Sequence, residues 1–365
     1  MLSSLNPVAP VYCVHPQRVA AVADEFLAGF PGRVLFAVKA NNEPAMLDEL
    51  WRSGIRYFDC ASLEEIALVA RRFPDARCYF MSPVRLPGAA HIAFRKYRVR
   101  HFMVDDPGAI PALTAEIDAT RCVIFARMAV HHESAVEDLS SKFGAKPPQI
   151  PAILDAIRET GAEAALAFNV GSGVRSPAAY EHALDVAADV LSRVSVPVRL
   201  LDVGGGFPRP YPGFVVPPLD DFFSAIRQCA AALPLAADAE LLAEPGRALC
   251  ADGLSTVVRV LLRKDDRIYV NDGMYGAFWE LRFDGHKQYP VTAYRNGARL
   301  DGEDKSFTIY GPTCDSNDRL PEAIRLPRDL AADDYLEFAT TGAYSLSGRS
   351  DFNGFYSDLV VRITP

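Results

Sequence analysis

Eight short apolar runs occupy the first two thirds of the chain, and helical patterns separate most of them. The runs cover residues 34–38, 55–61, 77–82, 100–105, 122–130, 165–171, 198–205 and 240–246. The stretches between them place apolar residues at i, i+3 and i+4, which is the period of an amphipathic helix. Buried strands that alternate with helices form parallel sheets, and eight strands in about 240 residues match a (β/α)8 barrel. An open doubly wound sheet is the structural alternative.

The pattern changes after residue 253, where strand-like segments follow one another with few helical stretches between them. Asn-Gly, Asp-Gly and Gly-Pro turns separate these segments, as is typical of an antiparallel β domain. The opening PVYCVHP is also strand-like, and we expect it to join this domain. The sequence therefore predicts a barrel over 16–253 and a discontinuous β domain made of 1–15 and 254–365.

Composition and charge exclude several classes of function. Half of the residues are hydrophobic and the net charge is −8, with no basic block of the kind that binds nucleic acid. The sequence shows no apolar run of about 18 residues for a membrane span, and no basic region followed by an apolar stretch for a secretory signal. The seven cysteines are odd in number and form no C-x-x-C pair. This pattern favours free thiols in a reducing cytoplasm over a disulfide framework or a metal site.

Three groups that can do chemistry fall at predicted strand ends, where a (β/α)8 barrel places its functional side chains. Lys39 follows the first apolar run; such a lysine either extends to water or forms a Schiff base, for which a partly apolar site lowers its pKa. The triplets GSG (171–173) and GGG (204–206) either bring backbone N–H groups close to a phosphate or form tight turns. Glu244 and Arg247 of EPGR either begin an ordinary helix or face a pyridine nitrogen and a phosphate. Together the three groups predict a site for pyridoxal phosphate.

The motifs also occur in a characteristic order. They are FAVKAN, FDCAS, SKFGA, FNVGSG, LDVGGGFP, EPGR, VNDGxYGxF, GPTCDS and GAYxxxxxxxFNGF, and they extend over almost the whole chain. In this order the sequence resembles the fold-type III pyridoxal-phosphate decarboxylases of basic amino acids, the ornithine/lysine decarboxylase group. The resemblance implies decarboxylation of L-ornithine or L-lysine to putrescine or cadaverine and CO2, a reaction of polyamine biosynthesis. It also implies a homodimer with shared active sites, in which Lys142 and Asp318 match an ion pair between subunits.

The resemblance assigns roles to individual residues. Lys39 would carry the cofactor, Glu244 would face the pyridine nitrogen, and Cys314 of the other subunit would return a proton to the carbanion. The cofactor-binding set implied is Lys39, Asp59, Arg127, Asn169, Ser172, Gly205, Gly206, Glu244, Gly246, Arg247 and Tyr344. The substrate-binding set implied is Asp284, Asp315, Tyr275 and Phe352, with the two acids on the distal ammonium. One departure is Asn169, because the family places a histidine there, stacked on the cofactor ring.

Other readings remain open at this stage. A diaminopimelate-type decarboxylase needs a basic group for the distal carboxylate, and Arg282 is the candidate. A modified diamino acid is another possible substrate. A racemase on the same barrel is disfavoured by Glu244, since racemases of this fold place an arginine there. A regulatory protein without enzymatic activity has only Asn169 in its favour.

Overall fold

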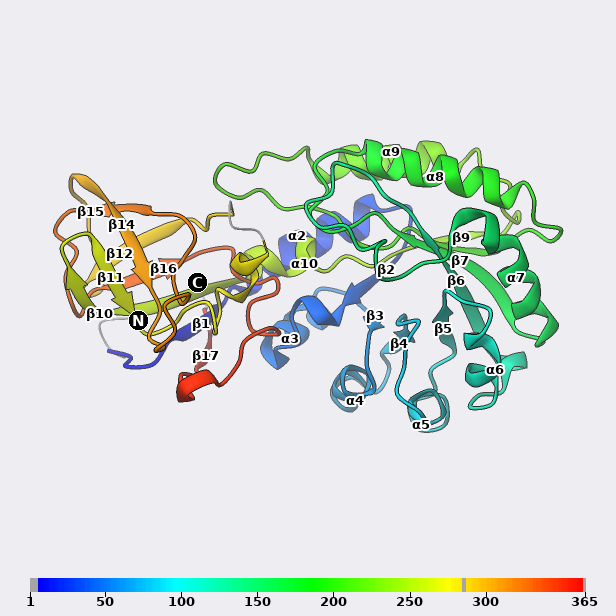
Figure 1. Ribbon diagram of the computed structural model, residues 1–365, viewed down its shortest axis with the longest axis horizontal. Coiled ribbons are helices and arrows are strands. Elements are labelled where there is room, and N and C mark those ends of the chain that lie inside the picture. Colours follow the sequence, from blue (N-terminus) through cyan, green and yellow to red (C-terminus); the bar gives the residue numbers. More distant parts are fainter. Residues whose placement is uncertain (1–5, 284–286, 364–365) are drawn as a thin grey trace.

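The computed structural model describes residues 6–283 and 287–363. Two units lie side by side, a barrel surrounded by helices on the right of Figure 1 and a unit made mainly of strands on the left. No helix within the described ranges is long and apolar enough to cross a membrane.

The first unit is a closed barrel of eight parallel strands, which confirms the predicted fold. Each strand pairs with the next, and β2 pairs with β9 to close the circle. The strands are β2 (Gly32–Ala37), β3 (Tyr57–Cys60), β4 (Arg77–Phe80), β5 (His101–Val104), β6 (Val123–Ala129), β7 (Glu163–Asn169), β8 (Leu200–Asp202) and β9 (Glu240–Ala243).

A helix follows every barrel strand, as the i, i+3, i+4 pattern predicts. In α4, for example, Ser62 caps the N-terminus by accepting a hydrogen bond from the Glu65 N–H, while Arg71 and Arg72 complement the dipole at the other end. The helices are α2 (Pro16–Gly29), α3 (Pro44–Arg52), α4 (Leu63–Arg72), α5 (Ala89–Lys96), α6 (Ala109–Thr114), α7 (Ile150–Glu159), α8 (Ala178–Leu191), α9 (Leu219–Ala230) and α10 (Arg247–Cys250).

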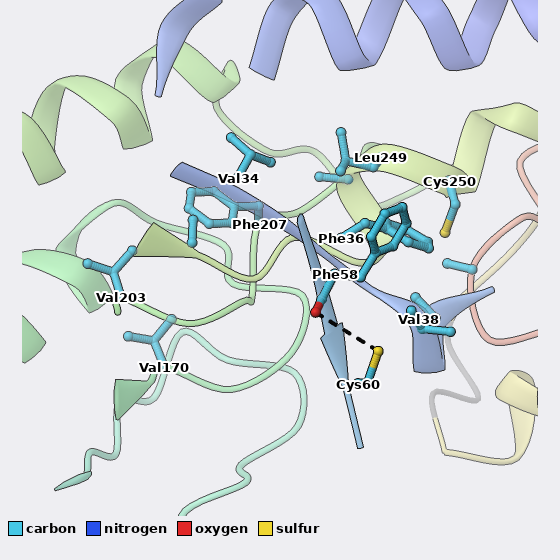
Figure 2. Close-up of a cluster of buried hydrophobic side chains, with 14 of the residues drawn as sticks. Val34, Phe36, Val38, Phe58, Cys60, Val170, Val203, Phe207, Leu249 and Cys250 are labelled. Atoms are coloured by element: carbon cyan, nitrogen blue, oxygen red, sulfur yellow. Dashed lines mark hydrogen bonds between the residues drawn. The ribbon is translucent and has the colours of Figure 1, made fainter. Parts of the chain in front are cut away.

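The barrel strands separate two apolar layers. Leu35, Phe125 and Leu242 belong to a small cluster that fills the barrel interior. The alternate positions point outward into a larger cluster, in which Figure 2 shows Phe36 of β2 and Phe58 of β3. Burying a side chain of this size contributes roughly 1.5–3 kcal/mol. The alternation of inward and outward apolar side chains therefore fixes the register of the barrel strands. That register in turn decides which side chains reach the open end of the barrel.

The second unit is a nine-stranded sheet, and its N-terminal strand joins it as predicted. β1 pairs antiparallel with β10, Val11 standing opposite Val257. The strands are β1 (Val11–Val14), β10 (Leu254–Lys264), β11 (Arg267–Val270), β12 (Val291–Arg295), β13 (Ala298–Arg299), β14 (Asp304–Tyr310), β15 (Ile324–Pro327), β16 (Tyr335–Phe338) and β17 (Val360–Arg362).

The sheet is mainly antiparallel, but two pairings depart from the expected pattern. β1 pairs parallel with β17, and β11 pairs parallel with β14. Turn residues predict only hairpins between consecutive strands, such as the β12–β13 hairpin at Asn296 and Gly297, where both residues have positive φ. Parallel neighbours are connected through long excursions, which carry no comparable local signal.

Hydrogen bonds join the two units beside Lys39. The Tyr344 N–H donates to the Ala40 carbonyl at 2.7 Å, and the Asn41 side chain donates to the Gly342 carbonyl at 2.7 Å. A Cβ on Gly342 would lie 1.8 Å from the Cys250 carbonyl oxygen, so only glycine permits this approach. The segment around Tyr344 is thereby held against the open end of the barrel.

Candidate active site

Lys39 reaches the open end of the barrel because β2 stops one turn earlier. A 3₁₀ turn over Val38–Ala40 buries its two apolar residues and leaves the lysine between them partly exposed, at 44% of its side chain. Lys39 Nζ lies 3.4 Å from Oδ2 of Asp59, which is buried at the end of β3. The Asp59 carboxylate raises the pKa of the Lys39 ammonium. Lys39 is therefore a cation stabilised by the Asp59 carboxylate. It must lose its proton before its nitrogen can act as a nucleophile.

Two further buried carboxyl groups lie beside this pair. Glu244 directly follows β9, and Asp202 ends β8. Burial raises the pKa of Glu244 well above its usual range and that of Asp202 to about 7; the negative charge of Asp59 adds to both shifts, and that of Asp202 adds to the shift of Glu244. Glu244 Oε1 and Asp202 Oδ2 are buried without a hydrogen-bond partner. An orphaned acceptor on Glu244 fits a ring nitrogen that carries a proton, which is what pyridoxal phosphate presents.

A glycine-lined recess adjoins these acids. It holds about 30 Å³ and opens into a cavity of about 310 Å³ that also contains Lys39. Gly206 has φ +104°, and a Cβ there would lie 2.8 Å from the Gly171 carbonyl oxygen. A Cβ on Gly246 would lie 2.7 Å from the Ala40 side chain. A larger residue at either position would clash with these neighbours, so the close approach of the chain segments here requires glycine. Such glycine-rich backbone fits a phosphate cradle of the predicted kind.

The predicted phosphate ligands meet at this recess. Arg247 Nη2 lies 3.3 Å from Ser172 Oγ, and Arg247 Nη1 lies 3.3 Å from the Tyr211 hydroxyl. The Arg247 guanidinium is 5.2 Å from the ring centre of Tyr344, whose φ of +53° directs the side chain into the cavity wall. Ser172, Gly205, Gly206, Gly246, Arg247 and Tyr344 all line the recess.

Arg127 and Asn169 also lie at this end of the barrel. Arg127 sits on β6, and its positive charge opposes the rise in the pKa of Glu244. Asn169 ends β7 and lines the recess; its Oδ1 accepts a hydrogen bond from the Gly171 N–H at 2.9 Å. The side chain that replaces the expected histidine thus fixes the turn of the GSG motif.

The predicted substrate-binding residues form a second cluster on the sheet unit. The Tyr275 hydroxyl donates to Asp315 Oδ2, and the rings of Tyr275 and Phe352 stack at 4.4 Å. Cys314 is exposed, and its N–H donates to Asn353 Oδ1 at 3.1 Å. Among the described residues that line the two cavities, none belongs to this cluster. Asp284 lies outside the described residues.

Three charged residues of the site were not predicted. Asp202 stands inside the LDVGGGFP motif, where a lone aspartate before glycine looks like an ordinary turn residue. Glu280 and Lys287 pair with each other and line the 310 Å³ cavity, and Glu280 also pairs with Arg247. Only Glu280 had a usable signal, because it follows the VNDGxYGxF motif by two residues.

The barrel, its lysine and the orphaned acid define a class, the fold-type III pyridoxal-phosphate decarboxylases of basic amino acids. The family model described as "Pyridoxal-dependent decarboxylase, pyridoxal binding domain" matches residues 16–251, and the chain belongs to this family of enzymes. Pyridoxal phosphate is its cofactor.

Individual relatives extend the match beyond the barrel. The chain is 31% identical to decarboxylase flvG of Aspergillus flavus over 344 residues, covering 88% of this chain and 78% of that protein. It is 32% identical to a lysine/ornithine decarboxylase of Selenomonas ruminantium over 333 residues, covering 88% and 81%. The crystal structure of a lysine/ornithine decarboxylase from Vibrio vulnificus, complexed with putrescine, superimposes with a TM-score of 0.85 at 27% identity, covering 99% and 96%.

Proposed function

We propose that this decarboxylase acts on L-ornithine or L-lysine, releasing CO2 and putrescine or cadaverine, as a reaction of polyamine biosynthesis. The observation that carries the proposal is the Lys39–Asp59 pair beside the orphaned Glu244 carboxyl at the open end of the barrel. The relative from Selenomonas ruminantium and the structures from Vibrio vulnificus with putrescine and with cadaverine support this substrate range.

The cofactor-binding roles follow from the positions of the side chains. Pyridoxal phosphate supplies an electron sink for the electron pair left behind when CO2 departs. Lys39 would hold its aldehyde carbon, and Glu244 would accept a hydrogen bond from its ring nitrogen. Arg247, with Ser172, would bind its phosphate in the recess. Asp59 orients the Lys39 nitrogen, and Asn169 keeps the GSG turn in place.

We infer that two copies of the chain share their sites. Cys314 and Asp315 do not line the cavity of their own chain among the described residues, so they can act only if another copy presents them. Phe352, Phe355 and Tyr356 are 38%, 45% and 48% exposed and form an apolar surface on the same unit. Burying such aromatic side chains is a common basis of stable dimers.

A mixed-dimer experiment tests the shared site. Lys39→Ala and Cys314→Ala should each be inactive alone, because every dimer then lacks one of the two groups. After co-expression, activity should return to about a quarter of the wild-type value, the statistical share for random pairing of two copies. The shared site is wrong if the mixture stays inactive while both variants are found in the same dimers.

Selection of the substrate would depend on the cluster around Asp315. Its carboxylate accepts hydrogen bonds from Tyr275 and from the Asn317 N–H at 2.9 Å, so it stays ionised and can hold a distal ammonium group. A hydrogen bond to a charged group contributes about 1.5–3 kcal/mol, which is enough to disfavour substrates without that amine. Cys314, beside Asp315, would return a proton to the α-carbon after CO2 leaves.

Arg282 favours a second candidate function. Its guanidinium lies 4.1 Å from the ring centre of Tyr275. The hydroxyl of the same tyrosine donates a hydrogen bond to the Asp315 carboxylate. An arginine beside the carboxylate offers a partner to a distal group that carries both an amine and a carboxylate. Diaminopimelate, or a modified diamino acid with such a group, is therefore the alternative substrate.

A substrate panel separates the two candidates. The cofactor-loaded protein would be incubated with L- and D-ornithine, L- and D-lysine, diaminopimelate and arginine, and CO2 and product mass would be followed. The first candidate predicts diamine and CO2 from L-ornithine or L-lysine, and a higher KM in Asp315→Asn with the cofactor spectrum unchanged. The second candidate would be established instead if diaminopimelate were the one substrate of the panel that is decarboxylated and if Arg282→Met abolished that activity.

We also infer a cytoplasmic location. All seven cysteines are free thiols, as expected in a reducing compartment, and six of them are buried or half-buried. Fractionation of cells that produce the tagged protein tests this inference.

A further inference from the structure

The loop that follows the glycine triplet GGG contacts both ends of the short helix α10, which carries Arg247. Phe207 anchors the start of this loop in the apolar cluster drawn in Figure 2. Arg209 pairs with Asp252, which lies just beyond the C-terminus of α10, at 2.9 Å from Nε to Oδ2. Tyr211 then contacts Arg247, the first residue of α10. These contacts place Tyr211 beside the phosphate recess.

A tight turn holds Tyr211 in this position. Its backbone exchanges two hydrogen bonds with that of Phe214, at 2.8 and 3.2 Å. Gly213, inside the turn, has φ +76°, a conformation that favours glycine. Tyr211 is 8% exposed and lines the cavity into which the recess opens. The tyrosine is therefore fixed in the cavity wall and does not extend into solvent.

The contact with Arg247 leaves the Tyr211 hydroxyl a proton to donate. A guanidinium group has no acceptor, so in the 3.3 Å contact Arg247 Nη1 is the donor and the phenol oxygen is the acceptor. A phenol that accepts a hydrogen bond in this way can still donate its own proton. Burial raises the pKa of the Tyr211 phenol, so the hydroxyl keeps this proton.

Tyr211 stands in the same relation to Arg247 as the predicted phosphate ligand Ser172. Arg247 Nη2 lies 3.3 Å from Ser172 Oγ, and Arg247 Nη1 lies 3.3 Å from the Tyr211 hydroxyl. Both hydroxyl groups line the same cavity. An anion that binds to this guanidinium therefore has a hydroxyl group beside each of its two terminal nitrogens.

We propose that the Tyr211 hydroxyl is a further ligand of the cofactor phosphate. It accepts a hydrogen bond from Arg247 and donates its own proton to a phosphate oxygen. The tyrosine thereby connects the guanidinium to the anion, and hydrogen bonds in such a chain strengthen one another. This inference rests on the phosphate recess of the proposed function, and not on the choice of amino-acid substrate.

A binding titration of Tyr211→Phe tests the proposal without turnover, because this variant loses the hydroxyl and keeps the ring. Cofactor-free protein would be titrated with pyridoxal phosphate and, separately, with pyridoxal, which lacks the phosphate. Fluorescence of Trp279 in the cavity wall reports binding. Hydrogen bonds to charged groups are the strong ones, so the variant should bind pyridoxal phosphate about tenfold more weakly or worse. Its affinity for pyridoxal should equal that of the wild type.

Tyr79→Phe is the matched control. Tyr79 is 1% exposed, and its hydroxyl also accepts a hydrogen bond from an arginine, Arg33. Arg33 stands at the start of β2, whereas Lys39 follows the end of that strand, so this pair lies away from the recess. The control should therefore bind pyridoxal phosphate as the wild type does. Circular dichroism and thermal unfolding show whether both variants fold.

A second background separates a direct phosphate contact from an effect on Arg247. In Arg247→Met the guanidinium is gone, and a tyrosine that only positioned it would have no further effect. Tyr211→Phe should nevertheless weaken pyridoxal phosphate about threefold or more in this background, because the phosphate loses its own hydrogen bond. The phosphorus NMR resonance of the bound cofactor should also move in Tyr211→Phe and stay in place in Tyr79→Phe. This resonance decides the question if Arg247→Met fails to fold.

Three outcomes would overturn the proposal. The first is that Tyr211→Phe binds pyridoxal phosphate with the affinity of the wild type. The second is that it weakens pyridoxal phosphate and pyridoxal to the same extent, because the hydroxyl would then only support the fold of the loop. The third is that it causes no further loss in the Arg247→Met background, because Tyr211 would then act on the guanidinium alone. A failure of ornithine and lysine as substrates would leave these titrations unchanged, so the two proposals fail separately.

Discussion

The buried acid Asp202 makes a sharp prediction for the cofactor-free protein. Its side chain is fully buried, with Oδ1 accepting the Gly204 N–H at 2.8 Å and Oδ2 unpartnered. Asp202→Asn replaces the carboxyl with a neutral group of the same shape. The variant therefore mimics the protonated acid at every pH, and its stability relative to the wild type reports the ionisation of Asp202.

The sign follows from proton binding in the folded and unfolded chains. Burial raises the pKa of Asp202 to about 7, whereas an aspartate in an unfolded chain ionises near 3.9. Between these values the folded protein binds the extra proton, so its free energy of unfolding falls as pH rises through this window. About three pH units at roughly 1.4 kcal/mol each set an upper limit of about 4 kcal/mol.

Urea unfolding of both proteins from about pH 5 to about pH 7.5 measures the effect. We expect the advantage of Asp202→Asn to grow with pH by about 1–2.5 kcal/mol over this range, since only about two of the three pH units fall inside it, and then to begin to level off. Asp301→Asn, at a side chain that is 76% exposed, is the control and should show no such growth. An advantage that stays constant within about 0.5 kcal/mol across the range would refute the reasoning.

Three further predictions concern the recess and the core. Gly206→Ala should weaken pyridoxal phosphate at least tenfold in the binding titration, because its Cβ would meet the Gly171 carbonyl at 2.8 Å; Gly88→Ala, with a similar backbone penalty and open space around it, should leave binding unchanged. Phe207→Ala should lower the free energy of unfolding by about 3–5 kcal/mol, because its buried ring lies with its centre 4.9 Å from the ring centres of Phe26 and Tyr180. Leu261→Ala, at a position that is 47% exposed, is the control and should lower it far less. Asn169→His removes the hydrogen bond to the Gly171 N–H and should cost about 0.5–1.5 kcal/mol in urea unfolding; an equal or greater stability would show that this bond does not hold the turn.

The sequence predicted those parts of the site that the topology brings together. Lys39, Glu244 and Arg247 each follow a recognisable strand, and a parallel barrel necessarily places the ends of its strands at one face. The β1 strand was placed in the second unit because its sequence is strand-like and precedes the barrel pattern. These predictions needed only the period of the apolar residues and the order of the motifs.

Partners that depend on the path of a loop could not be predicted in this way. Asp318 was expected to reach across to another subunit, yet it is 1% exposed and accepts the N–H groups of Met274 at 2.7 Å and Thr313 at 3.0 Å. Its carboxylate organises a turn within its own chain. Glu280 and Arg247 are 33 positions apart, and no periodic pattern indicates that they meet in a buried pair. The parallel partners of β1 and β11 were missed for the same reason.

The pairing of β1 with β10 and β17 has a consequence for synthesis on the ribosome. β1 is made first, but Val257 and Val360, which stand opposite its residues, belong to the last third of the chain. β1 therefore stays unpaired until β10 and β17 have been synthesised. The barrel strands pair with their neighbours in sequence, so most of them can pair as they leave the ribosome. Tyr344, which reaches the Lys39 turn, also arrives late. A nascent or prematurely terminated chain can therefore hold a nearly complete barrel and still lack Tyr344, the last residue of the recess lining to be synthesised.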